Sequence, residues 1–329
     1  MYIGPYLVDP PLVLAPMAGV SDMPFRKICR RFGAGLAISE MTHCDLDLLT
    51  TKKTRKRLDR TGEDAPISVQ IVGNHPERMA EIARYHVMQG AQIIDINMGC
   101  PNKKVCKAYA GSALLQDEAL VRCILYAVKN AVNVPVTLKM RTGWSNTQKN
   151  GLTIARIAEE VGIAAIAIHG RTREQKFHGV AEYDTIAEIK RAVSIPIIAN
   201  GDIDSPEKAD AVLRHTGADA LMIGRAAQGQ PWIFESIAHC LKTRQSAFTP
   251  DFATQQNVIL DHLEQLYAFY GPSDGVRIAR KHLGWYVQHY PDHASFRAEV
   301  NACENPATQL RVTKSYLKMI EINKNVPLG

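Results

Sequence analysis

Long apolar runs and paired cysteines are both missing from this sequence. None of its apolar stretches approaches the roughly 18 consecutive residues that a membrane-spanning helix needs. The seven cysteines are scattered and no CxxC pair occurs, which argues against a disulfide framework and a zinc ribbon. The first residues lack a basic start, and prolines interrupt them, so we expect no signal peptide. These absences favour a cytoplasmic protein with reduced thiols, no membrane association and no bound metal.

Basic residues outnumber acidic residues only slightly. The 329 residues carry 39 basic and 33 acidic side chains, and 46% of them are hydrophobic, which excludes a mostly disordered chain. From residue 245 onward eight basic side chains balance eight acidic ones, so the net charge of +6 arises before that point. Six basic residues and one acidic residue lie within KKTRKRLDR at 52–60. This distribution indicates a polyanionic partner.

Short β-rich apolar runs alternate with helical segments through the first two-thirds of the chain. The runs occupy residues 12–16, 36–40, 67–72, 93–97, 136–140, 165–169, 196–200 and 220–224. Such alternation predicts an α/β fold with a parallel sheet, and eight units in about 225 residues match a (β/α)8 TIM barrel. A doubly wound sheet produces a similar pattern, but no GxGxxG follows any early strand.

The pattern changes after about residue 240. The segment RQSAFTPDF is typical of a linker, with Pro250 as a breaker. Apolar residues at helical spacing follow and predict three or four helices. We therefore expect a barrel over residues 1–243 and a C-terminal all-helical domain over residues 244–329.

Polar or unusual residues end most of the predicted strands. In a barrel these positions converge on the carboxyl-terminal mouth, where active sites are built. Contact with solvent explains one or two polar strand ends, but it explains poorly why a lysine, a histidine, a glutamine, an asparagine and a cysteine end different strands. The sequence therefore predicts a site at this mouth.

Glycines directly follow the last two predicted strands, in PIIANGDI and ALMIGRAA. Gly201 and Gly224 let backbone N–H groups approach a phosphate closely, and the loops after strands seven and eight are the recurrent phosphate site of such barrels. Arg225 adds a charge-assisted contact. The alternative is that these glycines only turn the chain, but both loops share the feature.

Lys139 and Cys100 are the candidates for reactive groups. A lysine at a strand end can serve as the nucleophile of a Schiff-base aldolase, as a cation beside the electron-rich edge of a flavin, or as part of a buried ion pair. The spacing of the residues does not distinguish among these three roles. Cys100 lies in a tight turn between Gly99 and Pro101, which directs its thiol into the mouth. A thiol with a pKa of about 8.5 stays protonated at neutral pH, which suits a general acid.

Eight motifs spread over almost the whole chain resemble those of the tRNA-dihydrouridine synthases, most closely the bacterial B subfamily. They are APMAGVSDMPFR (15–26), SVQIVG (68–73), IDINMGCPNKKV with AGSALL (94–115), VTLKMRTGW (136–144), IHGRTR (168–173), IANGDI (198–203), DALMIGRAAQGQPWIF (219–234) and RIARKHLGWY (277–286). The Asn-x-Gly-Cys-Pro motif is highly specific, whereas IANGD and IGRA occur in other flavin barrels. No motif position departs from the family pattern.

The resemblance implies an FMN cofactor at the barrel mouth and NADPH as its reductant. By position, the residues around the cofactor would be Pro16, Met17 and Ala18 under the ring, Gln70 and Lys139 at its polar edge, and Asn200, Gly201, Asp202, Gly224, Arg225 and His169 around the phosphate. In this setting Lys139 stabilises the charge of the reduced flavin, and the aldolase interpretation no longer applies.

The resemblance also implies reduction of the C5–C6 bond of a tRNA D-loop uridine, with position 17 indicated by the subfamily. Hydride would pass from reduced FMN to C6, Cys100 would protonate C5, and Asn97 and Arg141 would orient the uracil. The target base must be extruded from folded RNA.

The family uses its helical domain to grip tRNA. The domain expected over residues 244–329 would present Arg277, Arg280 and Lys281 on one helix face to the RNA. The basic run at 52–60 follows the second strand on the mouth side, where it either contacts the RNA backbone or forms a solvated helix face. We expect a monomer.

Two other functions remain open at this point. A flavin barrel that acts on a free pyrimidine, such as a dihydroorotate or dihydropyrimidine dehydrogenase, needs neither the basic run nor the helical domain. An RNA-binding chaperone that lost catalysis would not need to keep Cys100 and Lys139.

Overall fold

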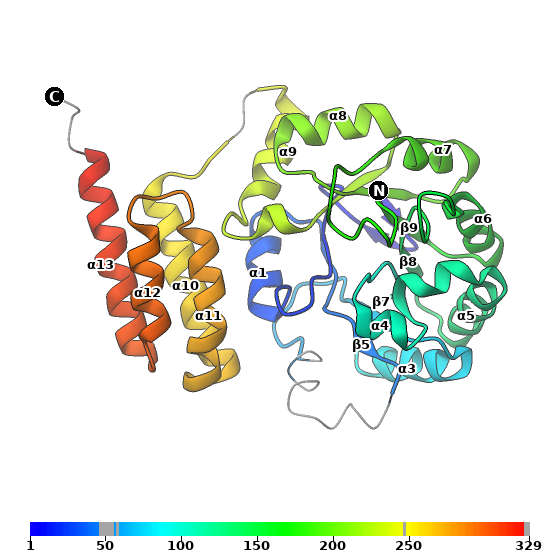
Figure 1. Cartoon of the computed structure of the whole chain (residues 1–329), viewed down its shortest axis with the longest axis horizontal. Helices are drawn as coiled ribbons and strands as arrows, with labels where there is room; N and C mark the ends of the chain where they lie inside the picture. Colours follow the sequence, from blue (N-terminus) through cyan, green and yellow to red (C-terminus); the bar gives the residue numbers. More distant parts are fainter. Residues whose placement is uncertain (46–55, 57–58, 246–247, 326–329) are drawn as a thin grey trace.

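The chain forms a barrel with a separate group of helices beside it, as the computed structural model shows (Figure 1). The structure describes residues 1–45, 56, 59–245 and 248–325. The predicted α/β barrel with a C-terminal all-helical domain is confirmed.

A nine-stranded parallel sheet forms the barrel, in the order β4-β3-β11-β10-β9-β8-β7-β6-β5. The strands are β3 (Leu12–Leu14), β4 (Leu36–Ala37), β5 (Thr42–His43), β6 (Ser68–Val72), β7 (Ile93–Met98), β8 (Val136–Arg141), β9 (Ala165–His169), β10 (Ile197–Asn200) and β11 (Ala220–Ile223). β4 and β5 are two pieces of the second barrel strand, because a bridge from Ile38 to Ser68 continues the pairing toward β6 between them. Each of the eight predicted strands is therefore present.

Helices surround the barrel, and each follows a strand. They are α1 (Met23–Arg31), α3 (Pro76–Met88), α4 (Lys103–Lys107), α5 (Glu118–Ala131), α6 (Gly151–Val161), α7 (Asp184–Ala192), α8 (Pro206–Thr216) and α9 (Ile233–Thr243), with the short 3-10 helices η2 (Gly111–Gln116) and η3 (Arg225–Ala227). Local signals set several ends: the Asp117 carboxylate accepts a hydrogen bond from Leu120 N at the start of α5, and Gly162 ends α6 with φ of +87°.

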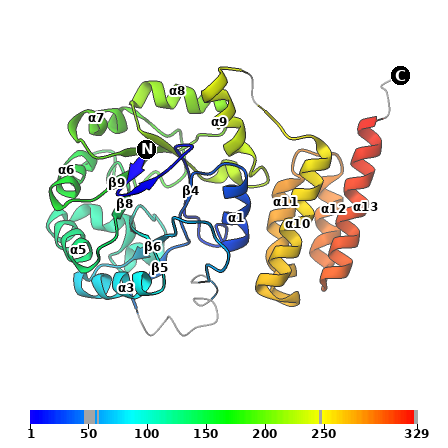
Figure 2. The same cartoon turned by 180° about the vertical axis from the view of Figure 1, so that it is seen from behind.

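The barrel interior is filled by side chains from the strands. β7 and β8 are buried along their whole lengths, including their polar residues. A short antiparallel hairpin, β1 (Tyr2–Ile3) with β2 (Tyr6–Leu7), lies over the barrel (Figure 2). Ile3 and Val8 belong to the same buried cluster as Val13 and Ile198, so this hairpin packs onto the barrel interior.

The helical domain consists of α10 (Phe252–Tyr270), α11 (Pro272–Tyr286), α12 (His293–Ala302) and α13 (Pro306–Asn325), with its own apolar core. The boundary that we predicted after residue 243 falls at the end of α9. α10 packs on α1 of the barrel, and the ring of Phe25 lies 5.8 Å from that of His262 and 5.6 Å from that of His282. The two parts thus share a packed contact.

Candidate active site

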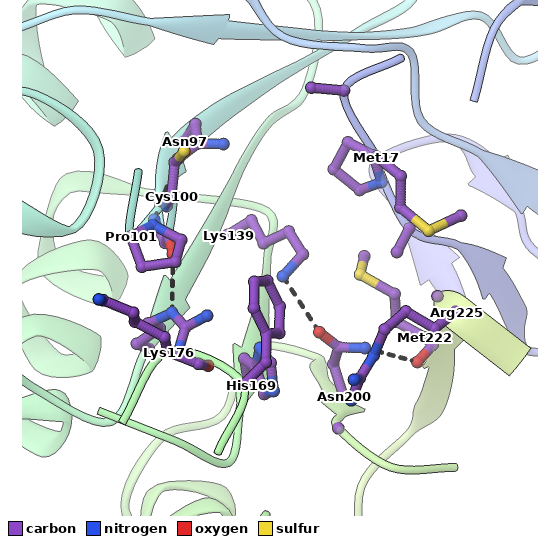
Figure 3. Close-up of a pocket in the computed structure, with 18 of the residues that line it drawn as sticks. Met17, Asn97, Cys100, Pro101, Lys139, His169, Lys176, Asn200, Met222 and Arg225 are labelled. Carbon is purple, nitrogen blue, oxygen red and sulfur yellow. Dashed lines mark hydrogen bonds between the residues drawn. The ribbon is translucent and has the colours of Figure 1, made fainter. Parts of the chain in front are cut away.

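A cavity of about 900 Å³ opens where the carboxyl ends of the barrel strands meet. Figure 3 shows side chains from several strands directed into it. The barrel residues predicted to contact the cofactor or the uracil, and the predicted acid, all line this cavity: Pro16, Met17, Ala18, Gln70, Asn97, Cys100, Lys139, Arg141, His169, Asn200, Gly201, Asp202, Gly224 and Arg225. Convergence of the strand ends therefore brings together residues that lie up to 209 positions apart in the sequence.

Lys139 is a buried cation at the end of β8. Its Nζ donates to Asn200 Oδ1 at 3.1 Å, and Asn200 Nδ2 donates to Met222 O at 2.8 Å (Figure 3). Burial, together with the positive charge of the nearby Arg141, lowers the Lys139 pKa to about 8, and Asp95 and Cys100 partly oppose this shift. Among the residues that the structure describes, no carboxylate lies within ion-pair distance of Lys139, although the charge of Asp95 favours its protonated form. The ammonium group is available to an anionic or electron-rich ligand.

His169 is neutral and its tautomer is determined by its neighbour. Burial, together with the positive charges of Lys139, Arg141 and Arg171, lowers its pKa to about 2. Its Nε2 lies 3.2 Å from Arg171 Nη1, and because a guanidinium only donates, Nε2 is the acceptor. The ring proton therefore resides on Nδ1, which makes this nitrogen a hydrogen-bond donor.

Asp202 holds two arginines at the cavity wall. Its carboxylate accepts from Arg171 Nη1 at 2.9 Å and Nη2 at 2.5 Å, and from Arg225 Nη2 at 3.0 Å. Burial alone would raise the Asp202 pKa, but the hydrogen bonds and the positive charge of Arg171 outweigh it and lower that pKa. The side chain of Asp202 thus orients guanidinium groups, and any phosphate contact at this residue falls to its backbone.

Gly201 is required by the backbone of the loop after β10. Its φ is +126°, and a Cβ there would lie 2.7 Å from Ala181 Cβ and 3.0 Å from His169 Cδ2. The following Asp202 also has a positive φ, of 45°. This tight turn brings backbone groups close to the cavity, as phosphate-binding loops do.

A hydrogen-bonded chain of buried side chains leads from the barrel interior to the Cys100 loop. Asp95 Oδ1 and Oδ2 accept from Thr137 Oγ1 and Gln70 Nε2, both at 2.6 Å. Gln70 Oε1 accepts from Asn97 Nδ2 at 2.8 Å. We call Asp95, Gln70 and Asn97 the interior hydrogen-bond chain. Asp95 was not among the residues predicted from the sequence, although an acidic residue within the largely apolar strand IIDIN was a signal for it.

Cys100 has a half-buried thiol that stays protonated at neutral pH. Burial raises its pKa, partly opposed by the backbone N–H of Asn102. Its carbonyl oxygen accepts from Ser112 Oγ at 2.8 Å and Ser112 N at 3.2 Å. A protonated thiol on a loop anchored in this way meets the chemical requirement for a proton donor.

Arg141 connects the Cys100 loop to the segment after β9. Its Nε donates to Gly99 O at 2.8 Å, and its Nη1 donates to Thr172 O at 2.8 Å and Lys176 O at 2.7 Å. Its guanidinium carbon lies 5.4 Å from the ring centroid of Phe177, a cavity residue with 53% of its surface exposed. Phe177 was not predicted as a cavity residue, since nothing in the loop sequence around it signals such a position.

The basic residues predicted to contact RNA lie outside the cavity and differ in their surroundings. Arg277 is exposed, whereas the half-buried Arg280 donates from Nη2 to Cys303 O at 2.9 Å. Lys281 is half-buried and donates to Gly19 O. Most of the run at 52–60 lies outside the described residues. Of its described members, Lys56 donates to Phe269 O, and Arg60 Nη2 lies 3.1 Å from His86 Nδ1.

Neither a metal site nor a membrane-spanning helix is found in the part of the chain that the structure describes. Within the described ranges, no cluster of three or more His, Cys, Asp or Glu side chains is placed to hold a metal ion. No helix among these same residues combines the length and apolar character needed to span a membrane.

The fold and cavity define a (β/α)8-barrel enzyme with its active site at the carboxyl ends of the strands. The family model described as dihydrouridine synthase (Dus) matches residues 13–322, and the chain belongs to that family. The resemblance seen in the sequence motifs is thereby confirmed.

Curated relatives extend this match over the full chain. The tRNA-dihydrouridine synthase B of Xanthomonas axonopodis pv. citri is 61% identical over 316 residues, covering 96% of this chain and 95% of the relative. The proteins of the same name from Xanthomonas campestris pv. campestris and Pseudomonas aeruginosa are 59% and 55% identical, over 100% and 95% of this chain and 99% and 95% of each relative.

Proposed function

We propose that this protein is a tRNA-dihydrouridine synthase that reduces the C5–C6 bond of a D-loop uridine, with FMN as cofactor and NADPH as reductant. The observation that carries the proposal is one cavity, in a chain of the dihydrouridine synthase family, that holds both the protonated thiol of Cys100 and the buried ammonium of Lys139. Free-pyrimidine reduction, the alternative, is an outcome of the test below.

The residues of the cavity fit FMN. Its volume of about 900 Å³ lies within the usual range of ligand pockets, roughly 300–1,000 Å³. Gly201 and Arg225 provide a close backbone approach and a cation for a phosphate, and the Lys139 ammonium suits the electron-rich edge of a flavin ring. Pro16, Met17 and Ala18 would pack against the ring face.

When bound, the flavin supplies the hydride. Cys100 holds a proton on Sγ that it delivers to C5 of the uracil, and burial keeps that proton in place at neutral pH. Arg141 contributes to uracil orientation through Nη2, because backbone carbonyls already accept from its Nε and Nη1. Asn97 supports the Cys100 loop through Oδ1, and its Nδ2, which also donates to Gln70, is the group that would contact the base.

Substrate RNA must bring its uridine into this cavity. Extruding a base costs a few kcal/mol. Contacts between basic residues and the RNA phosphates offset this cost. The exposed Arg277 on α11 is suited to such a contact. We propose residues 244–329 as the tRNA-binding domain and position 17 as the target uridine. The curated relatives named tRNA-dihydrouridine synthase B support tRNA as the substrate.

The decisive experiment maps dihydrouridine in tRNA by mass spectrometry. A strain lacking its own enzyme of this subfamily is complemented with this chain, and we expect dihydrouridine to return at position 17. A return at another D-loop position corrects the target alone. If no dihydrouridine returns while the purified protein reduces free uracil or orotate, the free-pyrimidine function is correct and the tRNA proposal is wrong.

A further inference from the structure

The loop between β3 and α1, residues 15–22, joins the cavity to the helical domain. Its first part, Ala15 to Ala18, lines the cavity. Its next residue, Gly19, is held from two sides: the backbone N–H donates to Glu40 Oε1 at 2.6 Å, and the carbonyl oxygen accepts from Lys281 Nζ on α11. Lys281 thus reaches from the helical domain to the residue that directly follows the cavity wall.

A second contact ties the other end of this loop to the same domain. Asp22 caps α1 by accepting from Phe25 N at 3.0 Å, and its second oxygen accepts from the Tyr270 hydroxyl at the end of α10, also at 3.0 Å. Within the loop, Met17 N donates to Ser21 Oγ at 2.8 Å. The loop is therefore internally bonded and contacts the helical domain at both Gly19 and Asp22.

The surroundings of Lys281 explain why its ammonium group lies on this loop. Asp22 and Glu40 are 6% and 5% exposed, and both carboxylates attract the ammonium electrostatically. Arg277, one helical turn earlier on α11, is exposed instead. Two basic residues that the sequence placed on one RNA-binding face therefore occupy different environments.

We propose that Lys281 is a positioning residue for the cofactor: through Gly19 it fixes the Pro16–Ala18 wall of the cavity, so that the helical domain stabilises the cofactor-binding surface of the barrel. The identity of the ligand in this inference rests on the proposed function. Lys281 then serves flavin binding rather than the direct RNA contact expected from the sequence.

The test compares Lys281→Met with Lys281→Arg and, as a matched control, Arg277→Met. For each full-length protein, freed of flavin, two quantities are measured: the dissociation constant of FMN from quenching of flavin fluorescence, and the dissociation constant of tRNA as a function of salt. Far-ultraviolet circular dichroism and the urea midpoint establish that each variant is folded.

We expect Lys281→Met to weaken FMN binding by about tenfold, as the loss of a charged hydrogen bond would, while its tRNA affinity and salt slope match the wild type. Lys281→Arg keeps a cationic donor and restores FMN binding. Arg277→Met gives the reverse pattern, with unchanged FMN affinity and a tRNA salt slope reduced by about one.

Two results overturn the inference. If Lys281→Met lowers the tRNA salt slope and leaves FMN binding unchanged, Lys281 is an RNA contact. If Lys281→Met changes neither the FMN affinity nor the tRNA salt slope, the contact between Lys281 and Gly19 does not position the Pro16–Ala18 wall.

Should Lys281→Met fail to fold, Tyr270→Phe removes only the hydroxyl contact to Asp22, and it must then weaken FMN binding in the same direction; unchanged FMN binding overturns the inference. Wild-type protein that binds no FMN refutes the proposed cofactor itself, which separates the two failures.

Discussion

The side-chain oxygen of Asn97 accepts a hydrogen bond from the backbone N–H of Cys100 at 3.0 Å. The same oxygen accepts from Gly99 N at 3.1 Å, so one amide group holds the turn that carries the thiol. Because the Asn97 amide is itself oriented by Gln70, and Gln70 by Asp95, the position of the thiol is determined by the barrel interior. The predictions below follow from this arrangement and from the contacts around it.

Replacing Cys100 by alanine removes the proposed proton donor and leaves the loop contacts made by its backbone. We expect FMN binding and NADPH oxidation to persist, while dihydrouridine formation falls by about 10² or more, the usual value of general acid catalysis. Mass spectrometry of tRNA and stopped-flow oxidation of NADPH measure the two separately. Wild-type dihydrouridine formation by Cys100→Ala would refute the assignment of the acid.

Replacing Asp95 by alanine leaves two buried donors, Thr137 Oγ1 and Gln70 Nε2, without their acceptor. We expect the free energy of unfolding to fall by about 2–6 kcal/mol, since each unsatisfied buried group costs about 1–3 kcal/mol. Asp95→Asn is the matched control: its Oδ1 still accepts from Gln70 and its Nδ2 donates to Thr137, so it loses less. If urea unfolding gives Asp95→Ala and Asp95→Asn the same free energy of unfolding, the proposed role of Asp95 as the acceptor in the interior hydrogen-bond chain is contradicted.

Lys139 makes the flavin-free protein less stable at neutral pH. Its pKa falls from 10.5 to about 8 on folding, so the folded state binds the proton less tightly than the unfolded state. The free energy of unfolding is therefore highest above pH 10.5, where Lys139 is neutral in both states. It falls by roughly 3 kcal/mol as the pH is lowered through about 8 and the buried amine takes up its proton. We therefore expect Lys139→Met to be more stable than wild type at pH 7, with an advantage that shrinks toward pH 10.

Urea unfolding of both proteins at the two pH values tests this prediction. A stability difference that stays constant from pH 7 to pH 10 would show that the Lys139 ammonium is not destabilised by burial. In parallel, Lys139→Met should bind FMN more weakly than wild type, because it lacks the cation at the ring edge.

Replacing Arg225 by glutamine tests the phosphate end of the cavity. This side chain is held by Asp202 at 3.0 Å and retains 57% exposure, so it can reach a ligand. We expect FMN affinity to fall by about tenfold to a hundredfold, the range for one charged hydrogen bond. Arg214→Gln, an exposed arginine on α8 paired with Asp210, is the control and should bind FMN as wild type does. Equal affinities for both variants would place the phosphate elsewhere.

Replacing Gly201 by alanine should cost more stability than the same change at another glycine with positive φ. The new Cβ would lie 2.7 Å from Ala181 Cβ, in addition to the strain at φ of +126°. Gly90 has φ of +88° and nothing within 4 Å of its Cβ position, so it reports the backbone strain alone. We expect losses of about 3 kcal/mol at Gly201 and about 1 kcal/mol at Gly90. Equal shifts in thermal midpoint would show that the Gly201 turn tolerates a side chain.

The barrel and its mouth could be predicted from the sequence because both depend on short-range patterns. Strands buried on both faces must be apolar along their length, and parallel strands present their carboxyl ends on one side, which is why strand-end residues such as Lys139 and Asn200 were found. The break between β4 and β5 was not predicted, because the run at 36–40 has the composition of one strand.

Sequence alone thus determined the class of fold, the strand-end residues assigned to the cavity and the family, all properties of local pattern and residue identity. Only the tertiary structure decided which partner each side chain meets: Asp202 between two arginines, Asp95 behind the Cys100 turn, and Lys281 on a loop 262 residues away. The physical reason is that a hydrogen bond depends on where two elements come within about 3 Å, and chain order does not encode that distance.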